Sequence, residues 1–257
     1  MTNVLVAIKR VPDLGGEISL TPDGMSVDDS SLGHTVSPHE ECAVELAIQV
    51  AKQTDGQATV LTVGSSDSVE QLRNALAVGC TAAVLVEADP AAYGPADVAT
   101  AIAEVVRAHE GAGTAYDLVL LGNDASDTGD FQVGIRLSYL LDRPVVAGVS
   151  TLAVSDDTVV ARGGSPDGGT EVFEVPMPAV LTVMEGGVEP RYPTIPGRMK
   201  AKKVQVENVT PAGVPDGPGR LRLKLPPPQP SQVTMLGEGP EAAGPVVDLL
   251  ETLGVVR

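Results

Sequence analysis

The chain has 257 residues, 43% of them hydrophobic, which is enough for one large α/β domain or a domain with an extension. Its formal net charge of −17 and its aromatic content of 2% argue against nucleic-acid binding, because phosphate would be repelled and bases would find few rings to stack on. No run of 18 apolar residues occurs, and no charged leader precedes an apolar segment at the N-terminus, so we expect a soluble cytoplasmic protein.

Apolar, β-branched runs alternate with helical patterns over the first 141 residues. We expect strands at 3–8, 58–63, 83–87 and 118–122, and helices at 38–52, 68–78, 96–110 and 130–141. This alternation predicts right-handed βαβ units in an α/β fold with a mainly parallel sheet flanked by helices. Runs such as DLVLLG, apolar on both faces, are typical of strands covered on both sides.

The pattern changes after Pro144. Strand-like runs at 145–154, 158–162, 171–175 and 179–183 are separated by SDD and GGSPDGG turns, which predicts a β-hairpin excursion followed by a return to the sheet. From about Val204 the chain is dense in Pro and Gly until an amphipathic stretch at 245–253. We therefore expect a domain over 1–203 and an extended arm over 204–257 that packs on a partner and ends in a helix; the alternative is a disordered tail.

Motifs of four large enzyme classes are absent, since the sequence has no GxxxxGK[ST], no GxGxxG after the first strand, no GxSxG and no HExxH. Cys42 and Cys80 lack CxxC spacing and lie in amphipathic or apolar segments, so we expect reduced core thiols. The three histidines are scattered, and His109 falls near the C-terminal end of a predicted helix, where the helix dipole favours positive charge. We expect neither catalytic nor metal-binding residues.

The segment Asp117–Gly134, DLVLLGNDASDTGDFQVG, is the best candidate for a ligand site. A buried strand ends at Gly122, a polar loop follows, and a helix is expected from about Asp130. In an open parallel sheet, ligands lie at the carboxyl ends of strands, beside helix N-termini whose free amides attract phosphate. Asp124, Asp127 and Asp130 would repel phosphate unless they cap amides, bind ribose hydroxyls or point away. A nucleotide site and a capped surface turn are both open at this point, with Asp130 as the N-cap in either case.

Two further segments should reach the same edge of the sheet. Ala7, near the end of the first strand, is small enough for a planar ring to approach the backbone. Ser37-Pro38-His39-Glu40 opens the next helix with a cap and a proline in the first turn. Taken alone, Ala7 is typical of an ordinary strand residue and Ser37–Glu40 of an ordinary helix start. Together with the loop after Gly122, they predict a cleft.

The segment 189–203, EPRYPTIPGRMKAKK, locally reverses the sign of the charge. Its cations are Arg191, Arg198, Lys200, Lys202 and Lys203. Three prolines and a glycine interrupt 190–197, so we expect a semi-rigid loop and no helix there, with Ile195 near its tip. An apolar residue on a stiff basic loop suits docking to another protein; the alternative is a solvated basic connector.

Seven strings, in this order, resemble the beta subunits of electron transfer flavoproteins. They are VAIKRVPD at 6–13, SPHEECAVELA at 37–47, RNALAVG at 73–79, DLVLLG at 117–122, DGGTE at 167–171, PAVLTV at 178–183 and EPRYPTIPGRMKAKK. The resemblance covers nearly the whole chain and implies a domain of the adenine-nucleotide alpha-hydrolase-like, Rossmann type. It implies an alpha subunit as partner, which carries most contacts to a redox-active FAD. It also implies a heterodimeric carrier, without substrate turnover of its own, that moves electrons from flavin dehydrogenases to a membrane quinone reductase or similar acceptor.

By the same resemblance, this chain holds a non-redox AMP. The implied cofactor-binding positions are Ala7, Ser37, Pro38, His39, Glu40, Val63, Gly122, Asn123, Asp124, Ala125, Ser126, Asp127, Thr128, Gly129, Asp130, Phe131, Gln132, Val133 and Gly134. Members with AMP usually have Asn and Thr where this chain has Phe131 and Val133. The Gln132-Val133-Gly134 string looks more like relatives that hold a second FAD for electron bifurcation, so AMP is the expectation and a second FAD the alternative.

The resemblance also places Leu14 and His39 beside the flavin. An imidazole at His39 would stabilise negative charge on a reduced flavin, and the alternative is a helix-start histidine that faces solvent. The implied docking residues are Arg191, Tyr192, Thr194, Ile195, Pro196, Met199 and Lys200. Ile195 stands where the loop usually has Leu, an exchange that conserves volume. Two other interpretations are a stand-alone nucleotide-binding stress-type domain, which would not need 185–257, and a nucleotide hydrolase, whose motif is absent.

Overall fold

The computed structural model describes residues 1–13, 15, 18–219, 221–227 and 233–256. The chain divides into two compact units, Met1–Leu223 and Lys224–Arg257. Leu14, predicted to lie beside a flavin, falls outside the described residues.

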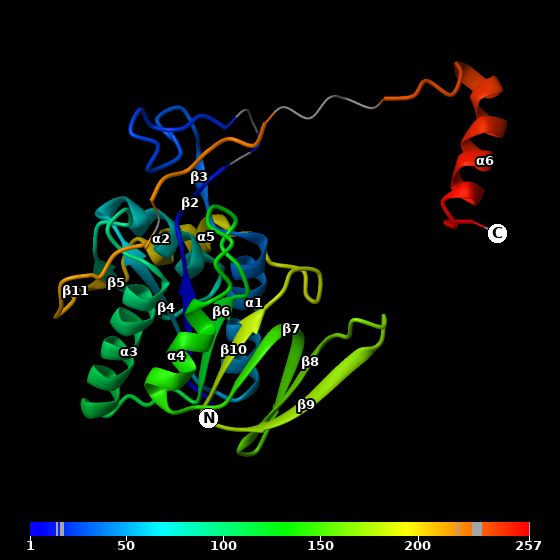
Figure 1. Ribbon diagram of the computed structural model, residues 1–257. Helices are drawn as coiled ribbons and strands as arrows, with labels where there is room; N and C mark the ends of the chain where they lie inside the picture. Colours follow the sequence, from blue (N-terminus) through cyan, green and yellow to red (C-terminus); the bar gives the residue numbers. More distant parts are fainter. Residues whose placement is uncertain (14, 16–17, 220, 228–232, 257) are drawn as a thin grey trace. The chain divides into compact units, whose positions relative to one another are not determined.

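The first unit is built on a nine-stranded sheet (Figure 1). In spatial order its strands are β11 (Val206–Val209), β5 (Ala82–Glu87), β4 (Ala58–Gly64), β1 (Val4–Ile8), β6 (Leu118–Gly122), β10 (Ala179–Val183), β7 (Val145–Ser155), β8 (Thr158–Gly164) and β9 (Thr170–Pro176). Neighbours from β11 to β7 are parallel, and β8 and β9 continue the sheet antiparallel. A separate antiparallel pair is formed by β2 (Val11–Pro12) and β3 (His34–Thr35). The predicted α/β fold with a mainly parallel sheet is confirmed.

The predicted excursion after Pro144 is an antiparallel meander. After β7, β8 and β9 the chain returns as β10, which lies between β6 and β7. The turn between β8 and β9 is closed by Ser165 N, which donates to the carbonyl of Gly169 (3.0 Å), and by Gly168 N, which donates to the carbonyl of Ser165 (2.9 Å). Gly168 has a φ of 82°, which glycine adopts without strain. The prediction of a hairpin and a return to the sheet is confirmed.

Helices cover both faces of the parallel strands. The four long helices of this unit are α1 (Pro38–Gln53), α2 (Val69–Val78), α3 (Pro95–Gly111) and α4 (Val133–Leu141), and the 3-10 turn η1 (Ser66–Ser68) precedes α2. α1 and α2 pack on one face of the sheet, whereas α3 and α4 pack on the other. In β1, Val4, Val6 and Ile8 face α1, and Leu5 and Ala7 face the opposite layer, because successive side chains of a strand alternate between faces.

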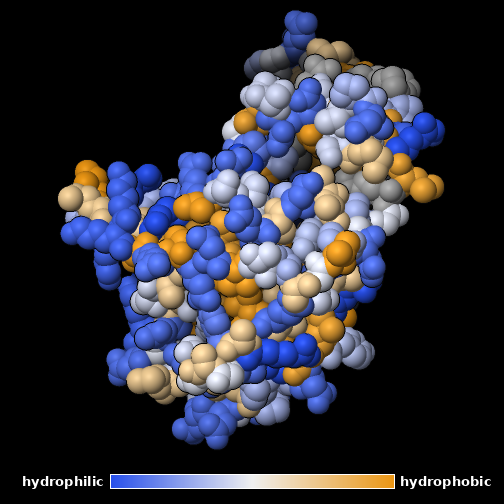
Figure 2. All heavy atoms as spheres, turned by 90° about the vertical axis from the view of Figure 1, so that its left-hand side faces the viewer, coloured by the Kyte–Doolittle hydropathy of each residue, from blue (hydrophilic) through white to orange (hydrophobic). Residues whose placement is uncertain are grey.

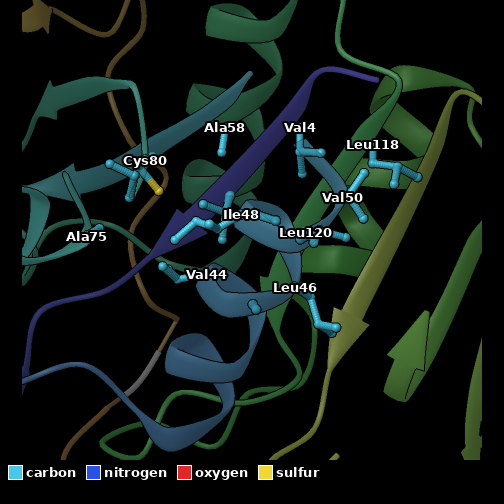
Figure 3. Close-up of a cluster of buried hydrophobic side chains, with 14 of the residues drawn as sticks. Val4, Val44, Leu46, Ile48, Val50, Ala58, Ala75, Cys80, Leu118 and Leu120 are labelled. Carbon is cyan, nitrogen blue, oxygen red and sulfur yellow. The ribbon is translucent and has the colours of Figure 1, made fainter. Parts of the chain in front are cut away.

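The core beneath α1 is aliphatic (Figure 3). Ile48 from α1 lies in one cluster with Val4 and Leu120 from the sheet. Cys80 joins this cluster just after α2, and Cys42 joins it from α1; both thiols are buried and free. Burial raises the pKa of the Cys80 thiol to about 12, so it stays protonated and packs as a small apolar group. The prediction of core thiols is confirmed.

Residues 195–201 differ from the prediction. The segment from Pro190 to Gly197 was expected to contain no helix, but α5 (Ile195–Ala201) begins within it, so that prediction is wrong at its end. Thr194 caps the helix, because its Oγ1 accepts from Gly197 N (3.1 Å). Pro196 lies in the first turn, where a backbone N–H needs no intrahelical partner and proline is well tolerated.

The first unit extends beyond the predicted domain end at residue 203. β11 adds to the sheet by pairing with β5, and the chain after it stays attached to α3. Asp216 N and Gly217 N donate to the Asp97 carboxylate (2.9 and 3.0 Å), and Ala212 N donates to Glu104 (3.3 Å). Hence the compact unit ends at Leu223, and only the residues after it form the second unit.

A groove of about 410 Å³ lies between α3 and β11, on the side of the first unit where Figure 2 shows apolar and polar residues interspersed. Val105 and Val209 are among its lining residues. His109 also lines it, with Nδ1 2.7 Å from the Tyr116 hydroxyl and Nε2 3.2 Å from Glu207 of β11. His109 therefore links a buried tyrosine to the edge strand, which is a structural role.

Among its described residues, the second unit contains one α-helix, α6 (Ala243–Thr252), preceded by the 3-10 turn η2 (Gly239–Ala242). Neither element contains a buried residue. Exposed apolar side chains of this helix and the residues after it are Val246, Val247, Leu249, Leu253, Val255 and Val256. Among the residues that the structure describes, no helix has the length and apolar character needed to cross a membrane.

Candidate functional site

Segments that are far apart in the sequence meet at the carboxyl edge of the parallel strands. Ser37, at the start of α1, donates from its hydroxyl to the carbonyl of Asp124, in the loop after β6 (3.2 Å). Gly122 lies against Glu40, and a Cβ at this position would be 2.7 Å from Glu40 Cγ, so the approach requires glycine. Ala7 of β1 pairs with strand residues on both sides, and Val63 lies at the same end of neighbouring β4. The structure thus brings the predicted cleft segments together.

Glu40 connects the end of β1 to the start of α1 through hydrogen bonds. Its Oε2 accepts from Ser37 N (2.9 Å) and lies 3.0 Å from Ser37 Oγ, and its Oε1 accepts from Lys9 N (2.7 Å). Ser37 Oγ accepts in turn from Glu40 N, which completes a capping box. Burial raises the pKa of Glu40 to about 7, although the hydrogen bonds from Ser37 and Lys9 act in the opposite direction.

Lys9 is a site residue that the sequence interpretation missed. Its Nζ lies 2.7 Å from Asp127 Oδ1, so the end of β1 is also joined to the loop after β6. The signal was available, because Lys9 directly follows the β1 residues at the edge where ligands bind in such sheets. The pair neutralises Asp127, which removes one of the three charges that would repel a phosphate.

The loop after β6 is tied to the sheet through Asn123. Its backbone N donates to the carbonyl of Val183 (2.8 Å), and its Oδ1 accepts from Thr182 Oγ1 (2.6 Å) and Gly148 N (3.1 Å). Gly134, at the start of α4, packs on the same threonine, because a Cβ there would be 2.3 Å from Thr182 Cγ2. The predicted position Gly134 therefore has a packing role between α4 and β10.

The first turn of α4 carries no side-chain cap. The helix begins at Val133, later than expected, and its N-cap is Gln132, so the prediction of Asp130 as N-cap is wrong. Gln132 Oε1 accepts instead from Arg136 Nε (3.1 Å) and Nη2 (2.9 Å). Phe131 has a φ of 52° and turns the chain into the helix; it is 58% exposed. The first amides of α4 are thus not occupied by the Gln132 side chain, as an anion-binding helix start requires.

Two polar atoms at the start of α1 and in the loop after β6 are buried without a hydrogen-bond partner among the described residues. They are Oδ1 of Asp124 and Nδ1 of His39, in the first turn of α1. A buried carboxylate oxygen needs a donor, and the hydroxyl of a ribose or the amino group of a base would supply one. Asp124 and the uncapped start of α4 together therefore suit a nucleoside phosphate better than a bare anion. The other predicted loop positions, Ala125, Ser126, Thr128, Gly129 and Asp130, are half-buried or exposed.

The predicted docking residues divide into an exposed group and a structural group. Tyr192, Ile195 and Met199 are 88%, 79% and 63% exposed, and Lys200 is exposed beside them. Thr194 and Pro196 shape the start of α5. The Arg191 guanidinium points inward and binds Glu45 of α1, with Nε–Oε2 and Nη2–Oε1 distances of 2.6 Å. Arg191 thus holds the segment in place, and an apolar surface is left facing outward.

Comparison with known proteins gives one consistent result. A family model described as "Electron transfer flavoprotein domain" matches residues 24–213. The chain is 32% identical to the electron transfer flavoprotein subunit beta of Bacillus subtilis (strain 168) over 257 residues, which cover 97% of this chain and 98% of that protein. It is 34% identical to the subunit of the same name from Syntrophomonas wolfei over 225 residues (87% and 86%) and from Homo sapiens over 212 residues (81% and 81%).

Proposed function

The chain belongs to the electron transfer flavoprotein family, and on that premise we propose that it is the beta subunit of a heterodimeric carrier. The carrier takes electrons from flavin dehydrogenases and passes them to a membrane quinone reductase or similar acceptor, and this chain transforms no metabolite itself. Family membership disfavours a stand-alone stress-type domain and a nucleotide hydrolase. The observation that carries the proposal is the edge of the sheet where the start of α1 meets the loop that leads from β6 to α4. Two buried polar atoms there have no partner among the described residues.

The cleft binds AMP in this proposal. The backbone amides at the start of α4 hold the phosphate, and the Lys9–Asp127 pair keeps one carboxylate of the loop from repelling it. Asp124 Oδ1 accepts from a ribose hydroxyl or from the base. Ala7 leaves room for the ligand beside the end of β1, because its side chain is only a methyl group. The nucleotide stabilises the fold by binding only the folded chain.

FAD, held mainly by the alpha subunit, supplies the redox chemistry of the carrier. The contribution of this chain is the first turn of α1, where the His39 Nδ1 is buried and free of a partner among the described residues. Such an imidazole can donate to an acceptor on the flavin and stabilise negative charge there. Glu40, directly after it, holds the same turn against β1 through its capping-box bonds.

Nucleotide analysis of variants tests the cleft. The chain and its partner subunit are produced together, acid extracts of the purified heterodimer are separated, and AMP and FAD are quantified by mass. Asp124→Ala should lower the AMP content well below one equivalent and leave FAD unchanged, because a buried acceptor is lost. Glu171→Ala, on exposed β9, is the control and should leave both contents unchanged.

Three outcomes would contradict parts of the proposal. Wild-type extracts without any adenine nucleotide would remove the nucleotide site. Two equivalents of FAD without AMP would replace AMP by a second FAD, as in a bifurcating carrier. Equal AMP content in wild type and Asp124→Ala would show that Asp124 is not part of the site.

A further inference from the structure

Helix α5 presents the exposed apolar side chains but is too short to be stable alone. It spans Ile195–Ala201, seven residues, whereas isolated helices of fewer than about 12 residues are marginal in water. Among these residues, only Ala201 is buried. Its conformation must therefore be imposed by neighbouring elements, and three contacts with α1 and α2 do so.

The first contact holds the segment that leads into the helix. Arg191 forms a two-point ion pair with Glu45, and Gln49 donates to the same carboxylate (2.8 Å). Burial alone would raise the pKa of Glu45, but the hydrogen bonds from Arg191 and Gln49 hold this pKa below its usual value. The carboxylate is thus charged and bonded to a guanidinium whose fork geometry fits it.

The second contact lies in the first turn. Gly197 rests on α2, and a Cβ there would be 2.3 Å from the carbonyl oxygen of Ala77. The third contact lies at the other end, where Arg73 of α2 donates from Nη1 to the carbonyls of Ala201 and Val204. Carbonyls at a helix C-terminus lack intrahelical partners, and a cation there is favourable. α5 is thus held before its start, in its first turn and at its end.

We propose that Arg73 and the Glu45–Arg191 pair are positioning residues, which keep α5 in its docking conformation before a dehydrogenase arrives. This inference rests on the proposed carrier function and on the docking role that the resemblance implies for Ile195 and its neighbours. A helix that is already ordered loses less conformational entropy on binding, so its affinity is higher for the same contacts. Arg73 is half-exposed, and its two hydrogen bonds go to α5 and to the chain just after α5. Removal of the Arg73 side chain should nevertheless weaken docking, because α5 would be less well ordered.

The test uses Arg73→Met in the full heterodimer, because Met keeps much of the side-chain length and removes the donors. Electron acceptance from a purified flavin dehydrogenase that reduces the wild type is followed against carrier concentration. KM for the carrier should rise by about three- to tenfold, with kcat, FAD and nucleotide contents unchanged. Arg73→Lys keeps one donor group and should recover part of the loss. Asn74→Ala, exposed on the next position of α2, is the matched control.

Amide hydrogen exchange separates positioning from docking. The amides of Arg198 and Lys202, which bond within α5, should exchange faster in Arg73→Met than in wild type. The inference would be overturned if these amides exchanged at the wild-type rate in Arg73→Met. It would also be overturned if they exchanged faster while the KM for the carrier stayed at the wild-type value. Ile195→Ala is measured alongside: if it raises KM and Arg73→Met does not, docking through α5 stands and positioning by Arg73 is wrong. If Ile195→Ala has no effect, the docking role itself fails.

Discussion

Two buried glutamates join elements that are remote in sequence. Glu40 accepts from Lys9 and Ser37 and connects β1 to α1, whereas Glu45 binds Arg191 and connects α1 to the segment before α5. The capping function of Glu40 was predictable, because Ser and Glu three positions apart at a helix start form a known local pattern. The partner of Glu45 was not, because its bond spans 146 positions and leaves no local signal.

Glu40 should make stability depend on pH. Burial raises its pKa from 4.5 to about 7, so the folded chain binds a proton that the unfolded chain has already released in this range. Its contribution to the free energy of unfolding is fully present below pH 4.5 and is lost as the pH rises through 7. This contribution is on the order of 3 kcal/mol. Glu40→Gln removes this titration. The drop in the thermal midpoint of the heterodimer between about pH 5 and about pH 8 should therefore be smaller than in wild type.

Glu171→Gln on exposed β9 is the control for this experiment, because it removes one carboxylate without disturbing the cleft. Its pH profile should follow that of the wild type. Equal drops for wild type and Glu40→Gln would mean that Glu40 does not titrate in this range.

At the scale of elements, periodicity predicted the strands and long helices of the first unit, because their burial patterns are strong and local. Several features were not predicted, among them the two-residue strands β2 and β3. The start of α4 is displaced by Phe131, whose positive φ no pattern indicates. α5 was excluded because the three prolines of 190–197 were counted as helix breakers, although Pro196 lies in the first turn, where a helix tolerates proline. β11 has four residues, none of them buried, and only its pairing with β5 makes it a strand.

The contact between α4 and β10 can be tested through Gly134. A Cβ at Gly134 would lie 2.3 Å from Thr182 Cγ2, and Thr182 is held by its bond to Asn123, so Gly134→Ala forces the helix or the loop to move. Overpacking of this kind typically costs about 1–3 kcal/mol. The thermal midpoint of the heterodimer should fall, and AMP content should fall with it because the loop moves.

Thr182→Ser provides the rescue, because it removes Cγ2 and keeps the hydroxyl that donates to Asn123. The double variant Gly134→Ala with Thr182→Ser should recover much of the lost stability. Gly164→Ala, where a Cβ would meet nothing within 4 Å, should change little. Failure of the rescue would show that the Cβ clash is not the cause of the loss.

For the whole molecule, the rule that ligands bind at the carboxyl ends of parallel strands predicted that the start of α1 and the loop after β6 meet at this edge of the sheet. The rule could not predict which charges of the loop would be paired, since Lys9 and Asp127 are 118 positions apart. It also could not show that the chain after residue 203 forms β11, which lies at one end of the sheet while the β7–β8–β9 meander lies at the other. Long-range pairings of this kind depend on the folded topology and have no signature in a local window.

The division into two units leads to the last prediction. The nine-stranded sheet and both of its hydrophobic clusters lie within Met1–Leu223. In contrast, α6 and its C-cap residue Leu253 expose Val246, Leu249 and Leu253, whose i, i+3 and i+7 spacing places them on one face. We propose that this face packs on the alpha subunit. Deletion of residues 224–257 should leave the melting of the first unit unchanged and abolish co-elution with the partner subunit.

A single variant of α6 makes the same test without shortening the chain. Leu249→Asp places a charge on the apolar face. It should weaken pairing by about 2 kcal/mol or more, because an aliphatic side chain that the partner would bury is lost and a carboxylate would be desolvated in its place. Glu251→Gln, on the same helix, should pair as the wild type does. Binding is measured by titration of the purified subunits. If the chain that lacks residues 224–257 binds the partner subunit as tightly as the full chain does, the interface lies on the first unit. The exposed residues Val172 and Phe173 of β9 would then be the next ones to substitute.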